Sequence, residues 1–516
     1  MHENILLTFL LILPFVGTLL IGIMPATASR LAAIFITAVM CVVSTQLAIS
    51  FNPHSLDMQF VQKVTWFAQP IPVEYHVGVD GMGLCLVVLT SFVMLMSVLA
   101  SQHIGEKRPK LYYSMLMLLT MSIMGVFVSL DLLQFFVMYE LELVPMYFLI
   151  AIWGGPNRDY AAMKFLLYTF FGGVLMLGGI LFLYFQLQLN GIEPHTFNMI
   201  ELAKQGSTLM RDVQALACLG FFLAFIIKLP SFPFHTWLPD AHVEAPTPVS
   251  MILAGLLLKM GSYGLVRICL GFFPEIITQW APYIILLGAF NIVWGAVACL
   301  VQTDMKRIIA YSSVSHMGFV LMGLGALSAA ALNGAIFQMI SHGVISAALF
   351  FLVGCVYERC HTRDLREIGG GLAKQMPFVF YFWMLATMAN LGLPGLAGFV
   401  AEAIVFYGTY TSPMATALGS DPKMVQFSCI LAATGVILSA GYMLWLLKRL
   451  FYGPEQPKWQ GHLHDMNLTE KLVALGLTVF IIGLGIYPRL ITNAYTPFAD
   501  QVCKNIAENL NNNRIQ

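Results

Sequence analysis

The chain has 516 residues, of which 59% are hydrophobic and 10% are charged. A soluble domain has about 25% charged residues, so this chain has too few to cover a water-exposed surface of its size. Its 26 basic and 26 acidic residues cancel, so no excess of charge indicates nucleic acid or an acidic partner. The composition predicts an all-α polytopic membrane protein embedded in a lipid bilayer.

Fourteen apolar segments follow one another along the chain, and a helix that spans a bilayer needs about 20 apolar residues. The first segment has no basic leader and no convincing cleavage site, so we expect it to be retained as a helix. The segments are 5–24, 31–49, 81–100, 111–129, 132–151, 164–187, 213–229, 247–270, 276–299, 305–325, 330–353, 375–409, 425–448 and 469–492.

The longest connection, residues 50–80, contains three prolines and an alternating stretch from Val73 to Val77. This pattern is consistent with a small hairpin at the surface. Loops after odd-numbered spans contain fifteen lysines and arginines, and loops after even-numbered spans contain four. The positive-inside rule therefore places the odd loops in the cytoplasm and both termini on the non-cytoplasmic side.

Two of the predicted spans contain breaks. The seventh runs into Lys228-Leu229-Pro230-Ser231-Phe232-Pro233, and the twelfth contains residues 391–398, with the sequence LGLPGLAG. Proline removes a helical hydrogen bond, and an opened backbone is tolerated in a bilayer only against protein or a water-lined cavity. Paired broken helices indicate a transporter built from inverted repeats around an ion path. A simple packing kink at each position is the alternative.

Charged and titratable side chains lie inside the predicted spans. A charge at the centre of a span costs at least about 2.5 kcal/mol, so each one indicates function by default. The residues are Glu140, Glu142, Lys164, Lys228, Lys259, His316, His342 and Glu402. Lys164 is close to an interface, where a lysine can extend towards water.

These residues can be ordered into a proton relay. Glu140 and Glu142 point to nearly opposite faces of a helix, so we expect one of them, Glu140, to face the polar path. Burial disfavours a lysine's charged form and a nearby carboxylate favours it, so such a pair can exchange protons near neutral pH. Histidine is suited to pass protons between such groups. The predicted relay is Glu140, Lys228, Lys259, His316, His342 and Glu402; the alternative is a set of ion pairs that only fixes helix packing.

No motif in the chain indicates a bound cofactor. The nine cysteines form no CxxC pair, which argues against a disulfide framework and an iron–sulfur cluster. The loop from His235 to His242 has two histidines and Asp240, but no further ligand completes a metal site. We therefore expect no metal and no cofactor in this chain.

Five stretches together resemble the antiporter-like subunits of respiratory complex I, of the subunit M (chain 4) type, over nearly the whole chain. They are Glu140–Tyr147 (ELELVPMY), Lys228–Pro230 with the following HTWLPDAH, Leu258–Gly261 (LKMG), Lys306–Phe319 (KRIIAYSSVSHMGF) and Gln338–Phe350 (QMISHGVISAALF).

The resemblance implies fourteen spans and two inverted five-helix repeats with helices 7 and 12 broken. The corresponding divisions are 1–110 for helices 1–3 and the hairpin, 111–270 and 271–452 for the two repeats, and 453–516 for the last helix and the tail. By the resemblance, Glu140 matches the essential carboxylate and Lys228 its partner, while Lys259, His316 and His342 match the central residues. Glu402 matches the terminal carboxylate, where other subunit types often have lysine.

The resemblance further implies a proton-translocating subunit of NAD(P)H-quinone oxidoreductase, whose partners are the other membrane-arm subunits. NAD(P)H or another donor, FMN, iron–sulfur clusters and quinone would be bound elsewhere in that complex. The membrane would be a bacterial inner membrane or a thylakoid membrane. A cation/proton antiporter subunit, a hydrogenase subunit of the same ancestry and a passive scaffold are the alternatives. The sequence leaves open the donor, the quinone, proton versus sodium, the stoichiometry and the half-channel residues.

Overall fold

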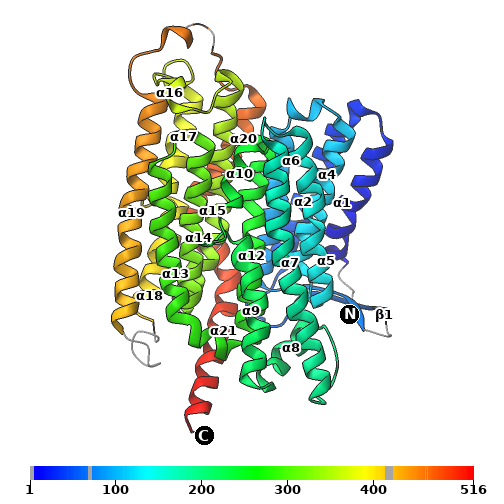
Figure 1. Cartoon of the computed structure of the whole chain (residues 1–516). Coiled ribbons are helices and arrows are strands. Elements are labelled where there is room, and N and C mark those ends of the chain that lie inside the picture. The colour runs from blue at the N-terminus through cyan, green and yellow to red at the C-terminus, as the bar shows by residue number, and fades with distance from the viewer. Residues whose placement is uncertain (1–4, 68–71, 413–421, 460, 462, 516) are drawn as a thin grey trace.

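The computed structural model describes residues 5–67, 72–412, 422–459, 461 and 463–515. Long helices run side by side in one bundle, with the N-terminal helices at one edge and α13, α18 and α19 at the other (Figure 1). Within the described residues, twelve helical segments are long and apolar enough to cross a membrane, which confirms a multi-pass membrane protein. They are α1 (Leu6–Ile23), α2 (Ser29–Ser50), α3 (Gly81–Ala100), α4 (Pro109–Val128), α5 (Leu132–Leu141) with α6 (Leu143–Trp153), α7 (Arg158–Leu189), α11 (Thr247–Ile252) through α12 (Leu258–Gly264) to Leu270, α13 (Pro274–Leu300), α14 (Met305–Gly325), α15 (Ala329–Cys360), α19 (Pro422–Phe451) and α20 (Leu468–Ile486).

The two remaining predicted spans are the two that the sequence marks as broken. The seventh forms α9 (Arg211–Lys228) and, beyond the prolines, α10 (Trp237–Glu244). The twelfth forms α17 (Pro377–Asn390) and α18 (Ala397–Tyr410), and Gly392 and Gly395 between them have φ values of +78° and +90°. Glycine tolerates this left-handed backbone at little cost, so the chain can reverse here. Both breaks are confirmed, whereas the total of fourteen spans and the inverted repeats stay predictions.

The eighth and last predicted spans differ from the expectation of single helices. The eighth contains two π-helical segments, η4 (Leu253–Leu257) and η5 (Leu265–Leu270), on either side of α12. The last ends at Ile486 just before Pro488, and a new helix, α21 (Arg489–Ile515), follows it. A proline cannot continue the preceding ladder of hydrogen bonds, which explains this end. Two short helices, α8 (Met199–Gln205) and α16 (Leu365–Ile368), lie in loops.

The predicted hairpin is present. Strands β1 (Gln59–Phe67) and β2 (Val73–Val79) pair antiparallel, with Lys63 opposite His76. An ion pair of 2.9 Å joins Lys63 to Glu74 across the two strands. The hairpin lies at the end of the bundle where α1 begins and α21 ends (Figure 1).

Three helical segments form the buried centre of the bundle. The most apolar windows of the segment from Thr247 to Leu270 and of α15 are completely buried, and that of α14 is 94% buried. By contrast, α1 and α20 are only 33% and 28% buried, so most of their apolar surface faces outwards. A fully buried helix that contains charged residues must satisfy them inside the protein, because no solvent reaches them. The three central segments contain Lys259, His316 and His342.

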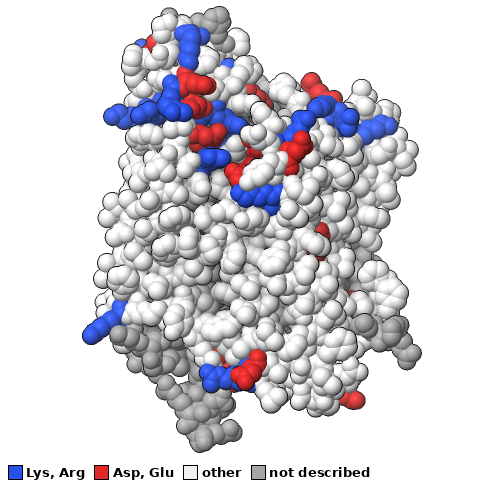
Figure 2. All heavy atoms as spheres, in the orientation of Figure 1, with Lys and Arg blue, Asp and Glu red and all other residues white. Residues whose placement is uncertain are grey.

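The surface has the charge distribution of a membrane protein. On the visible face, lysines, arginines and carboxylates gather at one end, a wide middle band has almost none, and the opposite end has few (Figure 2). The uncharged band matches the apolar helices, since a lipid-facing surface cannot hold exposed charge cheaply.

Candidate functional site: a buried chain of charged residues

The first buried charge pair joins α9 to the junction of α5 and α6. Lys228 is the last residue of α9, and its ammonium group forms an ion pair with the Glu142 carboxylate. Lys228 is 1% exposed and Glu142 is fully buried. Breaking a buried pair by removing one partner is strongly destabilising, because the other charge stays behind without compensation. This pair therefore fixes α9 against the fifth span as long as both groups are charged.

The structure pairs Lys228 directly with Glu142, the other carboxylate of the fifth span. The hydrogen-bond ladder of the fifth span is interrupted at Glu142, where α5 ends and α6 begins, and the Glu142 side chain lies against Lys228. Pro145 lies four residues after Leu141 and cannot donate a hydrogen bond to that carbonyl, which explains an interruption here. Glu142 keeps helical dihedral angles, φ −65° and ψ −23°, so the interruption is limited to the hydrogen-bond ladder.

Glu140 nevertheless lies close to the same lysine. Its carboxylate is near enough to Lys228 for the two to interact electrostatically, although no ion pair joins them among the described residues. A buried carboxylate oxygen, Glu140 Oε1, has no hydrogen-bond partner among the residues that the structure describes. A Cβ on Gly173 of α7 would lie 1.9 Å from Glu140 Oε1, so only glycine leaves room for this carboxylate. Lys228 thus has two carboxylates within its electrostatic reach.

The surroundings of Lys228 are aromatic. Its Nζ lies 5.1 Å from the centre of the Tyr139 ring and 5.6 Å from the centre of the Phe165 ring. Aromatic faces attract a cation over such distances, and the attraction is strongest where water is excluded. The rings stabilise the ammonium form without offering a second proton acceptor.

The second charged lysine lies at the centre of the bundle. The Nζ of Lys259 is 2.8 Å from His342 Nδ1 and donates a hydrogen bond of 2.5 Å to the carbonyl of Ala254. Ala254 belongs to the π-helical segment η4, where the backbone ladder is already irregular. Such π-bulges are frequent at functional sites because they redirect carbonyls and side chains.

Gly261 brings the two lysine helices together. A Cβ added at Gly261 would lie 3.1 Å from Lys228 Cβ, 2.7 Å from the Phe225 carbonyl oxygen and 2.8 Å from the Leu229 nitrogen. The backbone of α12 therefore packs directly on the end of α9. No hydrogen bond between Lys228 and Lys259 is found in the described part of the chain. The Lys228 pair and the Lys259 pair are therefore joined by backbone packing alone.

We expect Gly261→Ala to separate the two lysine helices, because the atoms in contact belong to the backbone and cannot turn away. Overpacking of this kind costs about 1–3 kcal/mol. The measurement is the thermal stability of the protein in detergent, with the matched substitution Gly178→Ala as control, since a Cβ there would meet nothing within 4 Å. Equal stability of the two variants would contradict the expected contact.

The remaining predicted residues continue the chain of contacts away from Lys259. The His342 and His316 rings lie 5.6 Å apart between their centres, and His316 Nδ1 is 3.5 Å from Glu402 Oε1. All four side chains are 6% exposed or less. Glu402 in α18 faces the broken segment, where a Cβ on Gly392 would lie 2.7 Å from its Oε2. The contacts from Lys259 through the two histidines to Glu402 therefore form one continuous series.

Comparison with known proteins identifies the family. Residues 129–420, more than half of the chain, match the family model described as NADH:quinone oxidoreductase/Mrp antiporter, transmembrane. The chain belongs to this antiporter family. The NAD(P)H-quinone oxidoreductase chain 4 1 of Synechococcus sp. (strain JA-3-3Ab) is 43% identical over 95% of this chain and 91% of its own length. These matches confirm the resemblance to chain 4 proteins.

Solved structures of the antiporter family have the same fold. A chain of respiratory complex I from Thermus thermophilus superposes with a TM-score of 0.85 at 25% identity, covering 96% of this chain and 99% of its own. A chain of the Mrp complex from Dietzia sp. DQ12-45-1b superposes with a TM-score of 0.80 at 21% identity, covering 98% of each chain. The second match is evidence of a shared fold only.

The predicted loop from His235 to His242 is mostly helix α10 in this antiporter-family chain, and its side chains contact neighbouring helices. His235 Nε2 accepts a hydrogen bond of 3.1 Å from Trp294, and the His242 ring stacks on Phe350 at 4.3 Å. Asp240 forms ion pairs with Lys164 at 2.7 Å and with Arg307 at 3.2 Å. His235, His242 and Asp240, the three candidate metal ligands, therefore each contact different residues and do not converge on one point. Among the residues that the structure describes, no group of three potential metal ligands is found.

Sequence reasoning missed a second buried ion pair. Arg267 lies within the eighth predicted span, and its guanidinium donates to Asp80 at 2.5 Å. Asp80 also caps the start of α3 by accepting from Gly83, so the pair attaches that end of α3 to η5. An arginine inside an apolar run was as strong a signal as the lysines. Asn390 and Gln338, which lie beside the histidines, carry no charge and gave no such signal.

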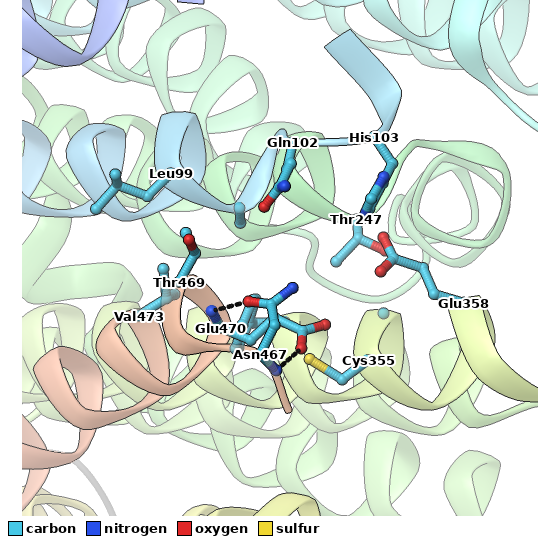
Figure 3. A pocket seen from close by; sticks show the side chains of 13 residues that line it. Leu99, Gln102, His103, Thr247, Cys355, Glu358, Asn467, Thr469, Glu470 and Val473 are labelled. Atoms are coloured by element: carbon cyan, nitrogen blue, oxygen red, sulfur yellow. Dashed lines mark hydrogen bonds between the residues drawn. The ribbon is translucent and has the colours of Figure 1, made fainter. Parts of the chain in front are cut away.

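A small pocket of about 20 Å³ lies at the more highly charged end, where α3, α15 and α20 meet (Figure 3). Asn467 and Glu470 form a capping box at the start of α20, and the Glu470 carboxylate also accepts from Arg359 of α15 at 2.7 Å. Figure 3 shows His103 and Glu358 on the opposite side of this pocket from the capping box. None of the relay residues lines it, so we interpret it as a joint between helices.

Proposed function

We propose that this chain is the proton-translocating chain 4 (subunit M) component in the membrane arm of an NAD(P)H-quinone oxidoreductase. The observation that supports this most directly is the buried series of contacts from Lys259 through His342 and His316 to Glu402. Charges this deep in a bundle of apolar helices are expensive, and proton relays are one of the few functions that require them. Relatives named as chain 4 match nearly the whole chain.

In the proposed mechanism each contact is one proton transfer. Lys228 holds or releases its proton according to the position of the carboxylates of Glu142 and Glu140. Lys259 exchanges a proton with His342, and His316 exchanges one with Glu402 across 3.5 Å. The transfer between the lysine halves and between the two rings requires a rearrangement, because those groups are not in hydrogen-bond contact. The broken helices α9–α10 and α17–α18 are the elements that we propose to move.

The proposed assembly and location follow from the same family. The electron donor, FMN, iron–sulfur clusters and quinone would be bound by other subunits, and the other membrane-arm subunits would be the partners of this chain. The membrane would be a bacterial inner membrane or a thylakoid membrane. The highly charged end seen in Figure 2 would face the cytoplasm or its equivalent, with both termini on the opposite side.

A cation/proton antiporter subunit is the second candidate function, because the Mrp complex chain has the same fold. That function would depend on sodium and would not require quinone reduction. Inverted membrane vesicles separate the two: we expect donor-driven acidification that is unchanged when sodium is omitted. Acidification driven by a sodium gradient in the absence of donor and quinone would favour the antiporter.

The variant that tests the proposed relay is Glu402→Gln, which keeps the shape of the side chain and removes its proton. We expect donor-driven acidification to fall at least about tenfold, at the low end of what a positioned proton-transfer group contributes. Native gels check assembly, and Glu106→Gln in an exposed turn after α3 is the control. Normal acidification in the assembled Glu402→Gln complex would contradict the relay.

A further inference from the structure

A narrow cavity lies where α17 ends, between the two histidines of the relay. Its walls include His316 of α14, His342 of α15 and Asn390, the last residue of α17. The space not filled by atoms is about 170 Å³, but it is too narrow to admit a water molecule. No water molecule can therefore bridge the polar side chains that line it.

Three buried polar atoms of the residues that line the cavity have no hydrogen-bond partner in the described part of the chain. They are His316 Nε2, His342 Nε2 and Asn390 Oδ1. The three side chains are 4%, 2% and 2% exposed, so water does not compensate them from outside. An unsatisfied buried polar group costs about 1–3 kcal/mol, and three around one small space indicate a function and not an accident of packing.

The chemistry of these atoms is complementary. His342 Nδ1 faces the Lys259 ammonium at 2.8 Å, and His316 Nδ1 faces the amide nitrogen of Gln338 at 3.4 Å. His342 Nδ1 lies beside the Lys259 donor and acts as an acceptor, so the hydrogen of a neutral His342 ring is on Nε2. His316 Nδ1 also lies 3.5 Å from Glu402 Oε1, and as a donor to that oxygen it leaves Nε2 of His316 as an acceptor. A donor on His342 and the Asn390 carbonyl oxygen, an acceptor, then belong to residues that line the same cavity.

We propose that Asn390 is a positioning residue of the relay, which accepts the Nε2 hydrogen of His342 while Nδ1 of that ring faces Lys259. When the amide oxygen moves away, this proton passes to Nε2 of His316, which gives its Nδ1 proton to Glu402. The proposal rests on the proposed function and names a residue beyond those assigned to it. A group that fixes the tautomer of a histidine in this way keeps the reactive nitrogen aimed at its partner. In the structure Nδ1 of His342 faces Lys259 and Nδ1 of His316 faces Glu402, so the two Nε2 atoms are left for transfer between the rings.

The position of Asn390 also connects the relay to the break in the twelfth span. Asn390 is followed directly by Leu391 to Leu396, which contain the two positive-φ glycines and join α17 to α18. One amide oxygen in this cavity cannot occupy the best position for both rings at once. A small rotation of the end of α17 would transfer the acceptor from one histidine to the other. The movement of a broken helix would thus select which of the two histidines accepts support from Asn390 during proton transfer.

The test compares Asn390→Leu with Asn390→Asp in the assembled complex. Leucine has a similar size but no acceptor, and we expect it to lower donor-driven acidification about tenfold, as is typical when a group that orients a histidine is removed. Aspartate keeps an acceptor oxygen at the same place, and we expect it to restore more than half of the lost rate. The matched control is Thr387→Val on the same helix, because Thr387 Oγ1 is also buried and unpartnered but is not among the residues that line the cavity.

Glu402→Gln is measured in parallel so that the two proposals fail separately. If Glu402→Gln abolishes acidification while Asn390→Leu acidifies at the wild-type rate, the role of Asn390 is overturned and the relay stands. If Asn390→Leu and Thr387→Val lose activity equally, or if Asn390→Asp restores nothing, the effect is one of packing and the proposal is overturned. If Glu402→Gln itself acidifies normally, the relay and the role of Asn390 both fall.

Discussion

Replacing Lys228 by methionine is expected to lower donor-driven acidification by at least about tenfold, because the buried proton carrier of the first half is lost. The substitution also leaves the Glu142 carboxylate buried without its partner. Such an uncompensated charge costs about 3–5 kcal/mol, so part of the loss could come from poor assembly. The single variant alone therefore does not separate transport from folding.

The double variant Lys228→Met with Glu142→Gln separates these two effects. It removes both charges of the ion pair, and a neutral pair in this buried place is expected to restore assembly and thermal stability. Acidification should stay as low as in Lys228→Met. Lys204→Met, an exposed lysine on α8, is the control for loss of a positive charge. Recovery of acidification together with stability would mean that Lys228 has a purely structural role, as in the passive scaffold.

The two carboxylates of the fifth span are expected to have unequal effects on stability. Glu142→Gln should lower the thermal stability of the assembled complex, because Glu142 forms the direct ion pair with Lys228 and is fully buried. Glu140→Gln should leave stability close to wild type, because no ion pair joins Glu140 to Lys228 among the described residues. Heating in detergent followed by native gels measures both.

In transport we expect the two carboxylates to be partly interchangeable. In each single variant Lys228 still has one carboxylate within electrostatic reach, so acidification should fall but persist. The double variant Glu140→Gln with Glu142→Gln should lose acidification at least about tenfold, more than the product of the single effects. Equal loss in Glu140→Gln and in the double variant would show that Glu142 has no part in transport.

Much of the fold follows from local composition. Apolar runs of about 20 residues mark the helices, since a span must bury its backbone and its side chains together. The prolines near Lys228 and the glycines near Leu391 mark both breaks correctly, because their effects on the backbone act within one or two residues. The alternating stretch before α3 likewise predicts the hairpin. The exceptions, the π-helical segments around Lys259 and the new helix α21, have only weak local signals.

For the candidate site, too, some features follow from the sequence and others only from the structure. The sequence by itself determined which residues are costly enough to be functional, because a charge inside an apolar run is expensive wherever its partner is. Only the tertiary structure decided the partners: Glu142 and not Glu140 forms the direct ion pair with Lys228. It alone placed Asn390 in the lining of one cavity with two histidines from other helices. Partners depend on how distant helices pack, and neutral residues show their role only when their neighbours are known.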